Sequence, residues 1–153
     1  MSASADLQEA IEELLSAPNA MRVPVPLVKR REKDLANAIE AAAANQGLCI
    51  FVMPPLPTSA LQNNPFVFFD KAELRVRIVE RPAMNALPAD AYDLVDDVAN
   101  ALHWQPRESG TKLGAILAYP LQLSARPTQM VEDPATRIID VIFDAVYGFQ
   151  PPS

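Results

Sequence analysis

The sequence predicts an α+β fold in which an antiparallel, possibly mixed, β-sheet packs against two or three α-helices. Residues 7–15 repeat apolar side chains at the three- and four-residue spacing of a helix face. Residues 73–78 instead alternate charged and apolar side chains, which is the period of a strand with one buried face. A chain of 153 residues that is 50% hydrophobic and 21% charged has the size and composition of one globular domain. We therefore expect a single domain over 1–153, with flexible ends at about 1–4 and 149–153.

The first third of the chain is predicted to form two helices. The first covers ADLQEAIEELLSA and ends at Pro18, and the second covers 32–45 and stops at Gly47. MRVPVPLV lies between them, and its alternating prolines cannot donate the hydrogen bonds of a central strand. This segment is expected to be an extended edge or a connecting arm.

Strands dominate the predicted remainder. LCIFVM is a short apolar run rich in strand formers, and FVFFDKAELRVRIVERP is the clearest strand of the chain. Between them, residues 54–65 are expected to be a proline-rich loop with a functional or interface role. The later elements are predicted as a helix over 88–103, a strand over 113–125, a polar link over 126–136 and a strand over 137–147.

The run RIIDVIFDAV fits either a helix or a strand, and the choice decides what Asp140 and Asp144 can do. On a helix the two carboxylates would lie one turn apart, roughly 6 Å along the axis, and could share a metal ion. On a strand they would share a face but lie about 13 Å apart. The β-branched residues and Phe143 favour the strand, so the two aspartates are expected to be separate charges on a half-buried sheet face.

The composition of the chain excludes several kinds of site. Cys49 is the only cysteine and His103 the only histidine, which excludes a disulfide within the chain and a structural zinc site. Cys49 lies in an apolar run and is expected to be a buried thiol, and His103 is expected to lie at a helix C-terminus. The net charge of −6 opposes a broad nucleic-acid surface, and no apolar run is long enough to span a bilayer. A protein of the cytoplasm, or of an assembly made there, is therefore expected.

Acidic residues leave metal chemistry open. Asp93, Asp96 and Asp97 could bind a hard cation, although acids at this helical spacing usually form a solvated face. Asp70, Lys71 and Glu73 approximate the acids and lysine of a metal-dependent nuclease without matching the usual spacing. Phosphate-binding glycine motifs and the G-x-S-x-G motif are absent from the sequence. No enzyme, cofactor or metal site is predicted, and a site made of acids alone is not excluded.

The order of elements resembles the tail terminator and minor tail proteins of long-tailed bacteriophages and phage-like particles. The resemblance rests on the helix ADLQEAIEELL, the strand AELRVRIVERP followed by AYDLVDDVANAL, and the closing pair LAYPLQLSA and RIIDVIFDAV. It covers most of the chain from about residue 30 onward, and the two N-terminal helices and MRVPVPLV depart from the family pattern. The resemblance implies a small subunit that forms a ring, typically a hexamer, on the end of the tail tube and presents a surface for joining the head.

We therefore expect a structural tail protein, found in the cytoplasm during assembly and then in the particle. Its expected partners are other copies of itself, the tail tube and head-completion proteins, without a membrane or specific nucleic-acid binding. The candidate subunit-interface residues are Glu73, Arg75, Arg77, Asp140 and Asp144, with the aspartates as possible salt-bridge partners across subunits. The alternative is a cytoplasmic adaptor or assembly chaperone that binds one protein partner through an apolar sheet edge.

Overall fold

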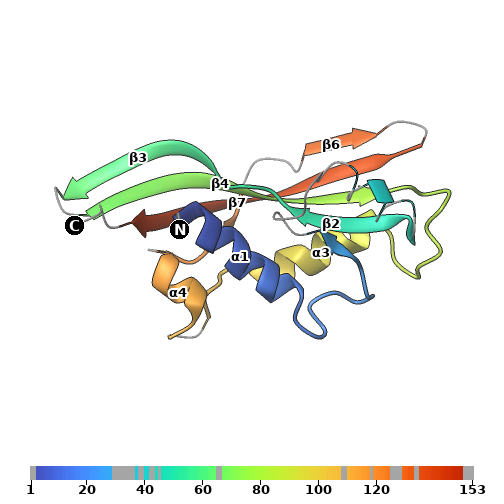
Figure 1. Cartoon of the computed structure of the whole chain (residues 1–153), viewed down its shortest axis with the longest axis horizontal. Helices are drawn as coiled ribbons and strands as arrows, with labels where there is room; N and C mark the ends of the chain where they lie inside the picture. Colours follow the sequence, from blue (N-terminus) through green and yellow to red (C-terminus); the bar gives the residue numbers. More distant parts are fainter. Residues whose placement is uncertain are drawn as a thin grey trace.

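The computed structural model shows one long sheet with α1 (Ala3–Leu15), α3 (Ala91–Leu102) and α4 (Lys112–Ile116) on one face (Figure 1). It describes residues 3–28, 37, 40–41, 44, 46–64, 67–107, 110–117, 119–124, 129–132 and 135–149. For 3–4, 28, 56–64, 67–71, 129–132 and 147–149 only the backbone is described. We call the sheet face that carries the helices the inner face and the opposite one the outer face.

Two long strands run through the middle of the sheet. β4 (Val67–Glu80) pairs antiparallel with β7 (Arg137–Phe149) from Phe68↔Phe149 to Glu80↔Arg137. Because side chains alternate between the faces of a strand, the sequence pattern fixes what each face carries. Leu74, Val76 and Ile78 point inward, opposite the inward-facing Phe143, Val141 and Ile139 of β7. The predicted strands at both positions are confirmed, including the strand assignment of RIIDVIFDAV.

Shorter strands complete both sides of this pair. β2 (Leu48–Val52) and β3 (Leu56–Asn64) follow one another along the same edge of β4, and β1 (Leu27–Val28) pairs parallel with β2. On the far edge of β7 lie β5 (Gln122–Leu123) and β6 (Gln129–Glu132). All pairings except β1–β2 are antiparallel, so the predicted α+β fold is confirmed in its mixed form.

Three helices cover the inner face. α1 (Ala3–Leu15) and α3 (Ala91–Leu102) present apolar stripes to the sheet, and the short α4 (Lys112–Ile116) packs beside α1. Asp90 starts α3 through a capping box, because its carboxylate accepts from Asp93 N while the Asp93 carboxylate accepts from Asp90 N. The core lies between these helices and the sheet. Its largest fully buried side chains are Leu7, Ile11, Leu48, Ile50, Leu74, Ile78, Leu94, Leu102, Leu121 and Phe143.

Two sequence predictions are wrong at the level of elements. The loop predicted over 54–65 contains β3, and its proline is tolerated because β3 is an edge strand with a register shift between Pro57 and Ser59. The strand predicted over 113–125 contains α4 and only the two residues of β5. Here Thr111 caps the helix by accepting from Gly114 N at 3.0 Å, which a short apolar run read by itself does not reveal.

Other boundaries need smaller changes. The link predicted over 126–136 contains β6, so the expected long hairpin is the shorter β6–β7 pair. MRVPVPLV ends in the edge strand β1, as its prolines indicate. Most of the helix predicted over 32–45 lies outside the described residues, as do the ends 1–2 and 150–153, although Gly47 adopts the left-handed φ of 76° expected of a helix stop.

Candidate functional site

The outer face of the central strands carries charge where a typical antiparallel sheet would carry scattered polar groups. Glu73, Arg75 and Arg77 alternate with the inward-facing residues of β4, and Asp140 and Asp144 do the same on β7. The register places Arg77 directly opposite Asp140 and Glu73 directly opposite Asp144. All five residues singled out from sequence therefore lie on one face of the same strand pair.

Four of the five are connected by ion pairs within one chain. Asp140 accepts from Arg77 Nε at 2.8 Å and from Arg77 Nη2 at 3.0 Å, which is a two-point guanidinium contact. Arg75 lies between the acids, with Nη2 2.9 Å from Glu73 Oε2 and Nη1 3.5 Å from Asp140 Oδ2. We call Glu73, Arg75, Arg77 and Asp140 the outer-face charge cluster.

The acids and bases of this cluster differ in exposure. The Glu73 and Asp140 side chains are 5% and 4% exposed, whereas those of Arg75 and Arg77 are 21% and 34% exposed. The hydrogen bond to Asp140 raises the pKa of Arg77 despite the opposing effect of burial. The two acids are thus buried, and the exposed part of the cluster belongs mainly to the two arginines.

Asp144 lies apart from this network. It is half-buried, opposite Glu73 on β4 and Gln122 on β5. Four residues of strand separate it from Asp140, or about 13 Å, which is too far for both carboxylates to bind one metal ion. In the part of the chain that the structure describes, no group of three or more His, Cys, Asp or Glu side chains could hold a metal.

One end of the outer face is apolar. Cys49, Val79 and Ile138 pack together on three adjacent strands, and the Cys49 thiol is fully buried. Burial, together with the negative charge of Glu40, raises the pKa of Cys49 to about 11. A thiol of this kind is protonated at neutral pH and is a packing group, as the sequence predicted.

Two acidic residues of α3 bind an arginine. Asp97 accepts from Arg22 N at 3.0 Å and from the Arg22 guanidinium at 2.9–3.2 Å, and Asp93 Oδ1 lies 3.3 Å from Arg22 Nη1. Burial raises the pKa of Asp97, but the hydrogen bonds and charge of Arg22 outweigh it and the net pKa is lowered. Two of the three acids considered as metal ligands thus bind an arginine from the segment after α1. The side chains of Asp70 and Lys71, considered for a nuclease, lie outside the described part of the structure.

His103 ends α3, as predicted, and its Nδ1 accepts from Leu123 N at 3.1 Å. The next residue, Trp104, has a left-handed φ of 69°, and its N donates to Leu121 O at 2.7 Å. Three large apolar side chains in or next to these two segments are exposed. They are Trp104, Tyr119 and Leu123, exposed by 53%, 65% and 43%.

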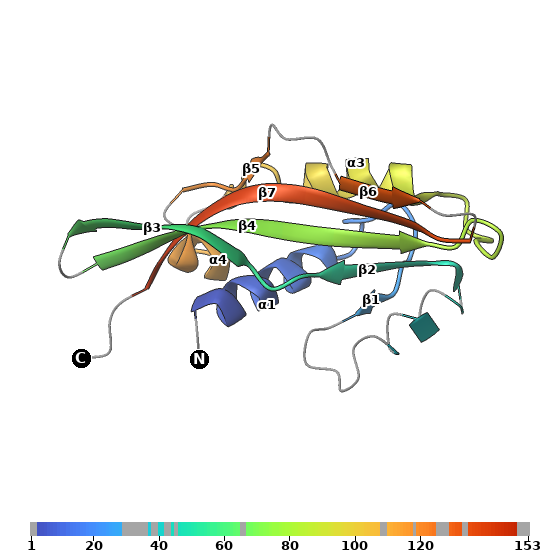
Figure 2. The ribbon, with the colours of Figure 1, turned by 90° about the horizontal axis from the view of Figure 1, so that it is seen from above.

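Beyond the helices, the sheet continues as a three-stranded arm made of β3, the first half of β4 and the end of β7. Figure 2 shows these strands running past α1 and α4. Among the described strands, β3 and residues 145–149 of β7 pair with β4 alone. No described strand therefore covers either outer edge of the arm.

No family model matches the sequence, and no curated protein matches it. The fold, however, has a counterpart. The chain shares its architecture with a chain of a gene transfer agent virion. The solved structure is described as the virion of a native gene transfer agent particle, and the two chains superpose with a TM-score of 0.60 at 15% identity. The match covers 93% of this chain and 94% of the virion chain, so it extends over most of both chains.

The alternation in the sequence predicted the charged residues of the outer face but not the arm. The run FVFFDKAEL indicates that β4 begins well before Glu73 and therefore needs a partner strand in that region. That partner, β3, was not predicted because the prolines of 54–65 favour a loop. None of the described helices is long and apolar enough to cross a membrane.

Proposed function

We propose that this chain is a structural subunit of a phage tail or phage-like particle, forming a ring that caps or completes the tail tube and connects it toward the head. The observation that carries this proposal is the three-stranded arm, whose two outer edges are covered by no described strand. The likeness to a virion chain supports it, because that chain is also a component of an assembled particle. This role requires interfaces and no catalytic centre.

The arm favours a ring over a two-fold dimer. One edge belongs to β3 and the other to β7, so the two edges differ in sequence and lie on opposite sides of β4. Contact between different surfaces of identical subunits is head-to-tail, and it closes into a ring when the rotation permits. Strand addition across such edges supplies backbone hydrogen bonds at every contact. A hexamer is the ring size that the resemblance to tail proteins implies.

Charge fits the same role. The chain carries a net charge of −6, and a ring of such subunits multiplies this charge around its opening. A negative lumen repels DNA phosphates and lets a genome pass without sticking. The arginines of the outer-face charge cluster would then contact an acidic neighbour rather than DNA.

Self-association tests the proposal directly. Light scattering at several concentrations should show a single large species, and electron microscopy should show rings of uniform diameter. Gln62→Lys on β3 should weaken assembly, because lysine on an edge strand opposes pairing. Asn100→Lys also replaces a side-chain amide by lysine, at an exposed position of α3. This variant is the matched control and should assemble normally. A chain that stays monomeric at high concentration and does not bind tail tubes would contradict the proposal.

A second candidate is an adaptor or assembly chaperone, and one observation favours it. Trp104, Tyr119 and Leu123 are large exposed apolar side chains, and aromatic side chains are enriched where proteins bind one another. An adaptor would give a stable heterodimer in pull-down experiments and no self-assembly. Trp104→Ala would then weaken capture of the partner, whereas Gln62→Lys would not.

A further inference from the structure

The segment Ala17–Val28, which we call the strap, connects α1 to the sheet and covers the edge of β2. Its last two residues form β1, and Ile50 N of β2 donates to Pro26 O at 3.0 Å. Pro24 and Pro26 have no N–H, so neither can donate a backbone hydrogen bond to β2. In the described structure, β1 is the only strand on this edge of β2.

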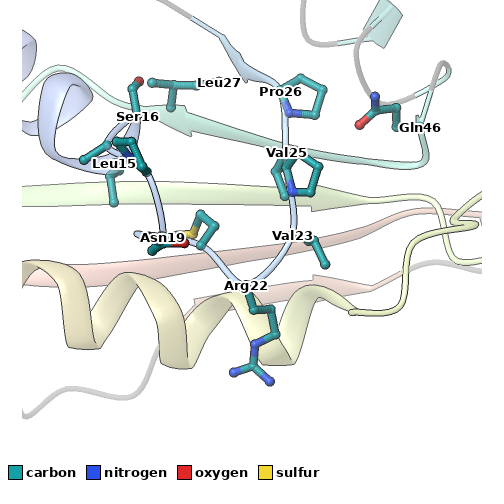
Figure 3. Close-up of a pocket in the computed structure, with 13 residues that line it drawn as sticks. Leu15, Ser16, Asn19, Arg22, Val23, Val25, Pro26, Leu27 and Gln46 are labelled. Atoms are coloured by element: carbon teal, nitrogen blue, oxygen red, sulfur yellow. The ribbon is translucent and has the colours of Figure 1, made fainter.

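Arg22 holds the middle of the strap to α3. Arg22 binds Asp97 of α3 through its backbone N–H and its guanidinium, and it also donates to Asp93 O at 3.2 Å. The Arg22 side chain is 45% exposed, so water competes for this contact. Figure 3 shows Arg22 pointing away from the sheet toward α3.

The strap borders open space. A hollow of about 750 Å³ is lined by residues 15–19 and 21–27 and by Gln46. Among the strap residues whose side chains are described, only Val23 is buried, and Met21, Val25 and Leu27 are partly buried against the core. A segment beside a hollow of this size makes fewer contacts than a close-packed interior, so less free energy is needed to displace it.

β2 itself is firmly held. All five of its residues are buried, and each pairs with β4 from Leu48↔Glu80 to Val52↔Val76. Lifting the strap would therefore leave β2 in place and expose its N–H and C=O groups along one edge.

We propose that the strap is a displaceable cover, and that its release lets an extended strand from a second copy of this chain pair with β2. The second copy is the partner because β2 and β3 lie along the same edge of β4. A strand from the second copy that pairs with the outer edge of β3 would next reach β2, whose edge is already paired with β1 of the strap. The identity of the partner rests on the proposed ring-forming function, whereas the displacement of the strap does not.

Backbone amide exchange on the full chain, followed by NMR under monomeric conditions, tests the displacement. Ile50 N–H points to the strap and Met53 N–H donates to Arg75 O of β4 at 3.0 Å, so the two report on opposite edges. Asp97→Asn keeps the shape of the side chain and removes its charge. It should speed exchange at Ile50 by about tenfold and change Met53 by less than about twofold. Glu13→Gln, which weakens an exposed ion pair with Lys112, is the control and should alter neither amide.

Equal acceleration of Ile50 and Met53, or none at Ile50, would overturn the displacement. The partner is tested by light scattering, where Asp97→Asn should lower the concentration at which half of the chain is assembled by severalfold. Faster Ile50 exchange with unchanged assembly, in a wild-type protein that does form rings, would overturn pairing with a second copy. A wild type that forms no rings contradicts the proposed function instead, and the Ile50 result then still decides whether the strap is displaceable.

Discussion

Asp140 of β7 lies directly across from Arg77 of β4 and accepts two hydrogen bonds from its guanidinium, at 2.8 and 3.0 Å. This pair ties the two longest strands together on the outer face of the sheet. Sequence analysis predicted salt bridges across subunits for these residues, and within one chain each already has a partner. A contact to a neighbouring subunit at this face stays a prediction and would have to use the exposed parts of the arginines.

Removing the Asp140 carboxylate should destabilise the fold. Asp140→Ala leaves Arg77 and Arg75 without their shared acceptor, and the loss of one member of a charged pair costs about 1–3 kcal/mol when the other can still reach water. Asp144→Ala, on the same strand and face, should cost less than about 0.5 kcal/mol because Asp144 lies outside the cluster. Urea unfolding measures both. Equal losses for the two variants would show that the cluster has no special role in stability.

Gln8 should be needed where β2 ends. This α1 side chain is 1% exposed, and its Nε2 donates to Val52 O at 2.7 Å. Val52 is the last residue of β2, and Pro54 and Pro55 follow without N–H groups. Gln8→Met keeps the length but leaves a buried carbonyl unpaired, so we expect a loss of about 1–3 kcal/mol in the free energy of unfolding. Glu9→Met, at a half-exposed position of α1, is the control and should lower the free energy of unfolding far less.

Gly47 and Gly110 form a matched pair for backbone strain. Both have left-handed φ values, 76° and 82°, but a Cβ at Gly47 would lie 2.5 Å from Asn85 N, whereas at Gly110 no described atom would lie within 4 Å. Gly110→Ala should cost only the left-handed penalty of about 1–2 kcal/mol. Gly47→Ala should lower the free energy of unfolding by about 1–3 kcal/mol more, because the backbone at Asn85 would have to move. Similar losses in thermal or urea unfolding would mean that the contact with Asn85 relaxes freely.

Cys49 should be inert in the folded protein. Because its pKa is raised to about 11, roughly one thiol in a thousand is ionised near pH 8, and burial blocks that fraction as well. Thiol reagents should label the protein only at the rate at which it unfolds, and rapidly in urea. A raised thiol pKa means that the folded state holds the proton more tightly than the unfolded state. Stability should therefore fall as the pH rises above about 9 toward 11, and Cys49→Ala should remove this part of the pH dependence. Rapid labelling under native conditions would contradict the buried position.

The acid dependence of the Arg22–Asp97 contact has the opposite sign. The pKa of Asp97 is lowered, so the folded state favours the carboxylate, and the contact stabilises the protein above the ordinary aspartate pKa. As the pH falls below about 4, this stabilisation should disappear. The difference in unfolding midpoint between wild type and Asp97→Asn should therefore be largest near neutral pH and vanish in acid. A difference that persists in acid would show that Asp97 acts through packing instead.

Local patterns predicted the elements that bury a regular stripe. α1, β4, α3 and β7 were all found because the periods of their apolar residues are long enough to be distinctive. The same alternation placed Glu73, Arg75, Arg77, Asp140 and Asp144 on one face. Which residues pair across the strands is a matter of register, and register is set by the fold as a whole.

The elements that were missed depend on contacts far along the chain. β3 contains proline and little alternation, and it is a strand because β4 offers it an edge. α4 has only five residues and exists because Thr111 caps it and Leu113 is buried in the core. Arg22 could not be matched with Asp97 from sequence, since 75 positions separate them and nothing local links the two.

The pairing of β4 with β7 is unbroken from the tip of the arm to the far end of the sheet. A force applied along the arm would therefore act in shear on every rung of this ladder at once, whereas a force that peels the strands apart would break the rungs one by one. The protein should therefore resist tension along its long axis, and its short outer strands should separate first.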